Sequence, residues 1–285
     1  MKINRATPDK HEYLASLTYI SDAPKLIFFT GSLPDARLPT VAIVGTRKPT
    51  AYGKEVAYRL ASELAAKGIV VVSGLALGID AIAHRGAIEA GGLTIAVLAN
   101  SVDTIYPRSH TGLAKQIITQ GGAILSEYEP PKEARGYQFL ARNRLVSGLS
   151  DAVVVVEAAS RSGTLNTASH ALDQGKYLFA VPGNITSPLS AGCNTLIKQG
   201  AFPVTRTEDI LEVIAPSLLS PQSPLPLGNT PAETAILSLI QGGIRDGDAI
   251  HQASGLNTAE FNQTLTMMEL DGRIRALGAN QWTVN

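Results

Sequence analysis

Residues 138–182 read QFLARNRLVSGLSDAVVVVEAASRSGTLNTASHALDQGKYLFAVP, and this stretch decides the fold. Its centre, Ala152 to Val156, is an almost unbroken β-branched run, which is typical of a strand covered on both faces in a parallel sheet. Ser162, Gly163 and Thr164 then form a small polar turn, and a helix is expected from Leu165 to Gln174. Because the first N–H groups of a helix have no internal partner, this turn can hold an anion.

Three arginines lie close to that turn in the sequence. Arg142 and Arg144 flank Asn143 upstream of the strand, and Arg161 is in the turn itself. Open α/β sheets bind their ligands at the carboxyl ends of their strands. The stretch therefore predicts an anion site where cations and backbone donors converge.

Strand and helix patterns alternate on both sides of this stretch. The expected strands are 41–44, 69–72, 94–98, 123–125, 152–156 and 177–181. The expected helices are 53–67, 78–90, 109–120, 139–148 and 165–174. This alternation indicates right-handed βαβ crossovers, so we predict an α/β fold with a doubly wound parallel sheet.

The chain of 285 residues is long enough for one such domain and a smaller one. We expect a lead-in segment at 1–39, the α/β domain at 40–214, a linker at 215–231 and a small domain at 232–285. The linker contains five prolines and no charged residue. The last segment shows three short helical patterns and two strand-like pieces, 273–277 and 281–284, which predict a winged helix.

Composition excludes several classes of protein. The hydrophobic content of 45% supports a core, and one cysteine, Cys193, excludes an internal disulfide framework. No apolar run is long enough to span a membrane, so we expect a soluble, cytoplasmic protein. The net charge of zero argues against a nonspecific polycation, although residues 229–285 carry three basic and six acidic side chains, or −3, against +3 for residues 1–228.

The first glycine-bearing motif is VGTRKPT at 44–50, directly after the first expected strand of the parallel sheet. It is not a dinucleotide fingerprint, because no GxGxxG follows and Ser73-Gly74 stands where an acidic residue would end the next strand. No Walker A sequence is present either, so we predict no ATP hydrolysis. Gly45, Thr46 and Arg47 suit a single phosphate; the alternative is a plain turn with a solvated arginine.

The second motif is SGLALGID at 73–80, with His84 one helical turn beyond Asp80. This pair suggests a metal site or a general base, but no further ligand cluster supports it, and a structural role is favoured. We therefore predict no metal and no cofactor. Ser73 and Gly74 remain candidates for contact with a ligand, because glycines here let a ligand approach the backbone.

Two further groups could add cations. Tyr106-Pro107-Arg108 and His110 follow an expected strand and could reach the same edge. Lys198 lies in GCNTLIKQGA at 192–201, where a solvated helix end explains it equally well. Cys193 in the same segment has no neighbouring base in the sequence, so it is not a candidate nucleophile.

Taken together, the motifs resemble the DNA-processing protein A family, DprA or Smf. The resemblance rests on GTRKP at 45–49, SGLALGIDAIAH at 73–84, YPR at 106–108, RNR at 142–144, SGLS at 147–150, EAASRSGT at 157–164, VPG at 181–183 and GCNTLIKQGA at 192–201. It covers most of residues 10–214, and the C-terminal part resembles the family's winged helix. It implies a Rossmann-like domain that binds single-stranded DNA, dimerises and helps load the RecA recombinase in natural transformation.

By position, the resemblance puts a phosphate-binding turn at Gly45–Arg47 and a basic pocket at Arg142–Arg144, with the turn at Ser162–Thr164 lining the same pocket. Phe139 falls close to a base, where stacking on DNA and a place in the core are both open. The sequence departs from the family in two places. Residues 1–39 are too short for the longer N-terminal helical domain of many members, and Asn166 stands where an apolar residue is commoner.

An alternative of another class is an enzyme that hydrolyses nucleoside monophosphates on a Rossmann-like fold. It would need a carboxylate beside the sugar, and Glu157 is the candidate, unless it fixes Arg142 or Arg144. The missing fingerprint and the missing acidic residue argue against a third alternative, a dehydrogenase. Single-strand binding needs phosphate donors, cations and an aromatic residue but no general base, so we predict a binding protein and not an enzyme.

The last helical pattern, Thr258 to Asp271, contains three acidic residues and no basic one. Phe261, Leu265, Met268 and Leu270 are expected on its packing side. Helices that read a DNA major groove normally present Arg or Lys. The C-terminal domain is therefore predicted to contact protein, with self-association and regulation both open.

Overall fold

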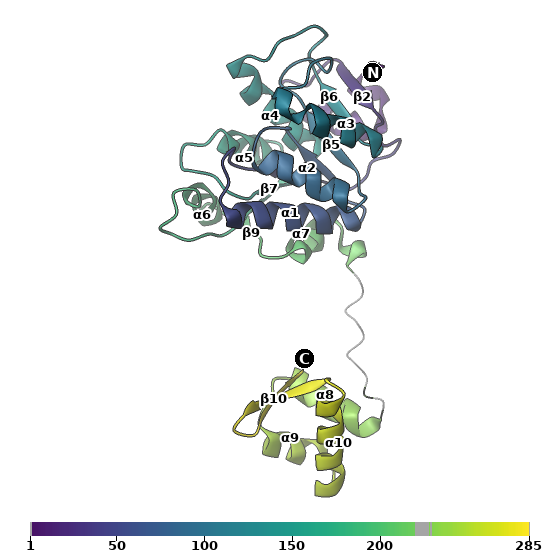
Figure 1. Cartoon of the computed structure of the whole chain (residues 1–285), viewed down its shortest axis with the longest axis vertical. Coiled ribbons are helices and arrows are strands. Elements are labelled where there is room, and N and C mark those ends of the chain that lie inside the picture. Colours follow the sequence, from purple (N-terminus) through teal and green to yellow (C-terminus); the bar gives the residue numbers. More distant parts are fainter. Residues whose placement is uncertain (1, 220–227, 229, 285) are drawn as a thin grey trace. The chain divides into compact units, whose positions relative to one another are not determined.

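The computed structural model describes residues 2–219, 228 and 230–284, and it divides into two compact units, Met1–Leu218 and Leu219–Asn285 (Figure 1). Most of the predicted linker, 220–227 and 229, lies outside the described residues. At its start, the short 3-10 helix Pro216–Leu218 still belongs to the first unit. Among the described residues, no helix is long and apolar enough to cross a membrane.

The first unit is built on a sheet that has nine strands within the described residues, in the order β1-β2-β6-β5-β4-β3-β7-β8-β9. The strands are β1 (Asn4–Ala6), β2 (Ile27–Gly31), β3 (Thr40–Val44), β4 (Val70–Ser73), β5 (Thr94–Val97), β6 (Ala123–Ser126), β7 (Ala152–Val155), β8 (Tyr177–Ala180) and β9 (Phe202–Pro203). The strands from β6 to β9 are parallel, whereas β1 and β2 are antiparallel to their neighbours. The predicted doubly wound parallel sheet is confirmed, with an antiparallel edge.

Helices cover both faces of this sheet (Figure 1). They are α1 (Ala51–Ala66), α2 (Ile79–Glu89), α3 (Thr111–Thr119), α4 (Gly136–Leu149), α5 (Thr164–Asp173), α6 (Ala191–Lys198) and α7 (Thr207–Ile214). Helix α2 packs between α1 and α3, and α4 packs against α5 and the 3-10 helix Glu12–Tyr19. Alternate strand residues such as Val44 and Val155 share one core with Leu145 and Val146 of α4.

The order of the strands creates a switch point beside β3. From β3 the chain steps outward through β4 and β5 to β6, and α4 then carries it back to β7 on the other side of β3. The connections after β3 and β7 leave in opposite directions, which opens a crevice at their carboxyl ends.

Residues 1–39 do more than lead into the sheet. They supply the antiparallel strands β1 and β2, and Tyr13, Leu14 and Leu17 are fully buried. The Tyr13 hydroxyl lies 3.2 Å from Thr40 Oγ1 at the start of β3. Neither strand was expected from the sequence; a three-residue strand such as β1 leaves no local pattern because it depends on pairing with β2.

The second unit contains α8 (Pro231–Gln241), α9 (Gly247–Ser254), α10 (Thr258–Leu270) and the hairpin β10 (Ile274–Gly278) and β11 (Gln281–Val284). This arrangement confirms the winged helix. Phe261, Leu265 and Met268 of α10 are buried in its core, but Leu270 is 76% exposed. The prediction for Leu270 is wrong because it lies two residues from Met268, and such residues point to different sides of a helix.

Candidate functional site

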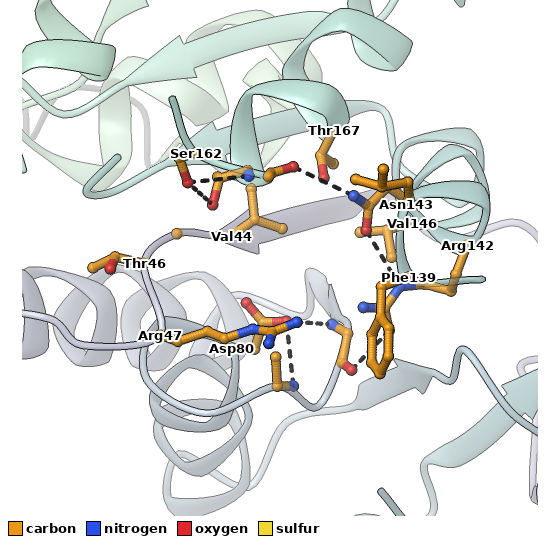
Figure 2. A pocket seen from close by; sticks show the side chains of 16 residues that line it. Val44, Thr46, Arg47, Asp80, Phe139, Arg142, Asn143, Val146, Ser162 and Thr167 are labelled. Atoms are coloured by element: carbon orange, nitrogen blue, oxygen red, sulfur yellow. Dashed lines mark hydrogen bonds between the residues drawn. The ribbon is translucent and has the colours of Figure 1, made fainter. Parts of the chain in front are cut away.

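An open pocket of about 290 Å³ lies at the switch point, beyond the carboxyl ends of β3 and β7 (Figure 2). Ten residues that the sequence proposed for the site line it: Gly45, Thr46, Arg47, Gly74, Phe139, Arg142, Asn143, Ser162, Gly163 and Thr164. They come from four separate segments of the chain. The crossover topology therefore assembles the pocket.

The turn after β3 forms one side of the pocket. The Thr46 N–H donates to the Glu157 carbonyl (2.8 Å), and the Thr46 carbonyl accepts from the Ile79 N–H (3.2 Å). Gly78 has φ +81°, and a Cβ there would lie 2.3 Å from the Thr46 carbonyl oxygen. Glycine is required at this position because both the φ angle and the close approach exclude a side chain.

Arg142 projects from α4 to the ends of β4 and β5 (Figure 2). Its Nη1 donates to the carbonyls of Gly74 (2.7 Å) and Val97, and its side chain is buried. Burial lowers the pKa of Arg142 to about 10, an effect that Asp80 opposes and Arg47 adds to. Arg142 is therefore a fixed, buried cation at pH 7.

Asp80 is the single carboxylate among the residues that line the pocket. It accepts from the N–H groups of Gly74 (3.0 Å) and Ala76 (3.4 Å), and so holds the turn after β4. Burial raises the pKa of Asp80, while Arg142 and these N–H groups lower it. With Asp80 ionised, the pocket carries two cations and one anion, a net charge of +1. The structural role that the sequence favoured for Asp80 fits these contacts.

Arg47 and Phe139 meet at the mouth of the pocket. The Arg47 side chain is exposed, and its Cζ lies 5.3 Å from the centre of the Phe139 ring. Among the ion pairs of the described residues, none involves Arg47. Phe139 is partly exposed and not part of the buried core. Arg47 is thus a cation whose charge is available to a ligand.

The start of α5 forms the opposite side. Gly163 is its N-cap residue, and the N–H groups that follow already have acceptors. The Thr164 N–H donates to Ser162 Oγ (3.2 Å), and the N–H groups of Leu165 and Asn166 donate to the carbonyls of Ser162 (3.0 Å) and Gly163 (3.2 Å). Asn143 Nδ2 donates to Asn166 Oδ1 (3.1 Å), which ties α4 to α5. Asn166, the departure from the family pattern, therefore has a partner among the residues of the pocket.

The structure does not bring Arg144 into this pocket. Its guanidinium pairs with Glu127 (2.6 Å) and its Nε donates to the Asp22 carbonyl (3.1 Å). The two arginines are two residues apart on α4, and such side chains do not share a helix face. The expectation of one pocket with Arg47, Arg142 and Arg144 is corrected on this point.

Three other candidates also lie apart from the pocket-lining residues. Ser73 is buried and its hydroxyl donates to the Ile43 carbonyl (2.7 Å). Arg161 is exposed in the turn before α5, and Lys198 is exposed at the last residue of α6. The solvated helix end accounts for Lys198.

Glu157, the candidate acid of the enzymatic alternative, does not line the pocket. It is buried and accepts from the backbone N–H (2.9 Å) and the hydroxyl (2.5 Å) of Thr50, the N-cap residue of α1. It therefore fixes neither Arg142 nor Arg144. No group of three or more His, Cys, Asp or Glu residues in the described part of the chain could hold a metal ion.

The remaining candidates of the sequence have other surroundings. His84 is buried with Nδ1 2.7 Å from Thr94 Oγ1. His110 Nδ1 donates to the Leu75 carbonyl (2.8 Å), whereas Arg108 lines a different cavity. Burial raises the pKa of the Cys193 thiol to about 11, in keeping with an inert cysteine.

Sequence reasoning missed six residues that line the pocket: Val44, Ala76, Asp80, Leu140, Val146 and Thr167. Leu140 is 49% exposed, which no helical pattern suggested. The SGLALGID motif did contain a signal for Ala76 and Asp80, because a glycine-bearing turn after a strand lies at the ligand-binding edge.

Comparison with known proteins gives the family. The model of the family described as DNA recombination-mediator protein A matches residues 4–215, and the DprA winged helix domain matches residues 220–280. The chain belongs to the DNA recombination-mediator protein A family. The resemblance seen in the motifs is confirmed.

Named relatives agree with this assignment. Protein Smf of Escherichia coli is 45% identical over 204 residues, which are 72% of this chain and 54% of that protein. The chain thus spans about half the length of that relative. The DNA processing protein DprA of Bacillus subtilis is 42% identical over 74% of this chain and 71% of its own length.

Two solved structures of the family share the fold. DNA processing protein A from Streptococcus pneumoniae aligns with a TM-score of 0.69 and 37% sequence identity. The alignment covers 75% of this chain and 75% of that one. The Helicobacter pylori protein has a TM-score of 0.67 at 34% identity, over 76% of this chain and 97% of that one. Its structure was solved to explain how it binds single-stranded DNA.

Proposed function

We propose that this chain binds single-stranded DNA and that the pocket at the switch point holds the phosphate backbone. The proposal rests on one observation: two arginines, exposed Arg47 and buried Arg142, line a pocket whose single carboxylate, that of Asp80, already accepts hydrogen bonds from the backbone. The phosphates of a nucleic acid neutralise such cations. The DNA-binding relative from Helicobacter pylori supports the same reading.

We propose no chemical reaction for this protein. A nucleotide hydrolase needs a carboxylate next to the sugar, whereas Glu157 holds Thr50, the N-cap residue of α1, and Asp80 holds a turn. We therefore keep a binding role and do not retain the hydrolase. Membership of a family described as recombination mediators supports a role in loading the RecA recombinase during natural transformation, with a homodimer as the working form.

The pocket is tested by comparing Arg47→Ala with Lys48→Ala. Both side chains are exposed and adjacent in sequence, but only Arg47 lines the pocket. We expect Arg47→Ala to weaken binding of single-stranded oligonucleotides alike for all sequences and to lower the salt slope by about one unit. Lys48→Ala should change the affinity much less. Equal effects of the two substitutions would reject the pocket in favour of a diffuse cationic surface.

RecA loading is tested separately, by RecA-dependent strand exchange on single-stranded DNA with the wild-type chain and with Arg47→Ala. Stimulation by the wild type that the variant lacks is the expected result. Full DNA affinity without any stimulation would remove RecA from the proposal and leave the DNA site intact.

A further inference from the structure

Tyr106 extends the aromatic surface of the pocket beyond Phe139. Its ring centre lies 5.6 Å from that of Phe139, with 57° between the ring planes. Half of Tyr106, 50%, is exposed, although it is a large aromatic residue. An exposed ring at the rim of an anion pocket is available to a flat apolar group.

Phe139 itself is already engaged. The Arg47 guanidinium lies 5.3 Å from its ring centre, and Tyr106 packs against it at a tilt. A base that stacked on Phe139 would have to compete with these two neighbours. The more exposed aromatic surface next to the pocket belongs to Tyr106.

The loop that carries Tyr106 is anchored to the pocket. The His110 N–H donates to the Pro107 carbonyl (2.9 Å), and the His110 ring donates through Nδ1 to the Leu75 carbonyl (2.8 Å). Leu75 belongs to the turn after β4 and has φ +55°, so this bond holds a turn in the left-handed region. An anchored ring loses little conformational entropy when a ligand stacks on it.

We propose that Tyr106 is a stacking platform for an unpaired base of the strand whose phosphate occupies the pocket. The inference rests on the proposed single-strand binding and adds a base contact to it. Stacking on an aromatic ring is worth about 1–3 kcal/mol per base and tolerates every base, because each has a π face. Tyr106 thereby favours unpaired over paired DNA without reading sequence.

The test compares Tyr106→Ala and Tyr106→Phe on two oligonucleotides of equal length, oligo(dT) and a strand of abasic sites that keeps all phosphates. We expect Tyr106→Ala to weaken oligo(dT) binding about tenfold and Tyr106→Phe to leave it unchanged, since the ring is retained. Both variants should bind the abasic strand as the wild type does. The matched control is Tyr19→Ala, which removes a tyrosine that is 89% exposed and belongs to the 3-10 helix Glu12–Tyr19.

Three results would overturn the platform: an unchanged affinity of Tyr106→Ala, an equal loss on the abasic strand, or an equal loss with Tyr106→Phe. Arg47→Ala on the same strands separates this failure from failure of the proposed function. If Arg47→Ala weakens both strands while Tyr106→Ala is neutral, only the platform is lost. If the wild type binds neither strand, the single-strand function itself is wrong.

Discussion

Arg142 and Arg144 lie on the same helix but have different partners and different roles. Arg142 donates to carbonyls at the ends of β4 and β5 and faces the pocket, whereas Arg144 pairs with Glu127 away from it. The side chains of the Arg144–Glu127 pair are 8% and 17% exposed. Such a pair costs more to break than a surface pair, because the remaining charge stays buried.

We predict that Arg144→Met and Glu127→Gln each lower the free energy of unfolding by on the order of 3 kcal/mol, while single-strand affinity at a temperature where the variants are folded stays unchanged. Urea unfolding of the two single variants and of the double variant measures this. The double variant should lose less free energy of unfolding than the two single variants lose together. Arg206→Met, which breaks the exposed Arg206–Asp209 pair, is the control and should lower the free energy of unfolding much less than either substitution. Lost DNA affinity at full stability would return Arg144 to the binding site.

His84 gives the chain a dependence of stability on pH. Thr94 Oγ1 donates to the Val71 carbonyl (2.7 Å), so it accepts from His84 Nδ1. Burial, and then the nearby His110 and Arg142, lower the pKa of His84 to about 3. Between pH 6.5 and 3, His84 binds a proton in the unfolded chain but not in the folded chain. The free energy of unfolding therefore falls as the pH falls.

The expected slope from this one group is up to about 1.4 kcal/mol per pH unit below pH 6.5. His84→Asn keeps an amide donor for Thr94 and removes the titration. Urea unfolding at pH 7, 6 and 5 should therefore show a flatter pH dependence for His84→Asn than for the wild type. The same slope in both proteins would mean that His84 takes up its proton in the folded state.

At the scale of elements, much of the fold could be predicted because the signals are local. The β-branched run at 152–156 and the glycine turns after strands specify buried strands and crossovers without knowledge of their neighbours. The same positions at strand ends predicted most of the pocket. The direction of a side chain was harder, since Arg144 and Leu270 each depend on the rotation of a helix that packing decides.

Other features depend on distant partners and leave no local pattern. Strand β1 exists through pairing with β2. Glu157 follows β7, yet it accepts a hydrogen bond from Thr50, the N-cap residue of α1, which lies 107 positions earlier. The left-handed backbone of Leu75 is likewise held by His110 from another loop. A sequence pattern records periodicity and turns, not these contacts.

The turn of Gly78 gives a prediction about an element. Gly78 and Gly91 both have positive φ, but a Cβ at Gly91 would meet nothing within 4 Å, whereas at Gly78 it would meet the backbone of Thr46 and Arg47. We expect Gly91→Ala to cost about 1 kcal/mol of stability with normal DNA binding. Gly78→Ala should cost more and also weaken single-strand binding, because the turn of Arg47 must move.

Urea unfolding and oligonucleotide titration of the two variants check this. The Gly91 variant supplies the cost of a positive φ angle in open space, so the excess at Gly78 measures the close approach together with the unusual ψ of −128° there. If the two variants had the same stability and the same DNA affinity, the turn after β3 could move to accept the Cβ without any effect on the pocket.

At the scale of the whole molecule, the two units differ in charge. Residues 229–285 carry three basic and six acidic side chains, and one of the basic ones, Arg273, pairs with Glu233 of α8. The winged helix has its own buried cluster, including Ile236, Phe261 and Met268, so it has a core of its own. The first unit holds the proposed DNA pocket, with its cations.

We therefore predict that residues 1–219 keep most of the single-strand affinity and that residues 228–285 alone do not bind duplex DNA at physiological salt. Groove-reading helices present Arg or Lys to the DNA, whereas α10 carries Glu260 and Glu269 and no basic residue. Fluorescence anisotropy of both fragments with single-stranded and duplex oligonucleotides measures this, after circular dichroism has shown that each is folded. Replacing both exposed glutamates, Glu260→Lys and Glu269→Lys, should introduce weak, salt-sensitive duplex binding if repulsion is the obstacle. Tight duplex binding by the unmodified fragment would instead make the winged helix a second DNA-binding unit and contradict the protein-contact role inferred from its charge.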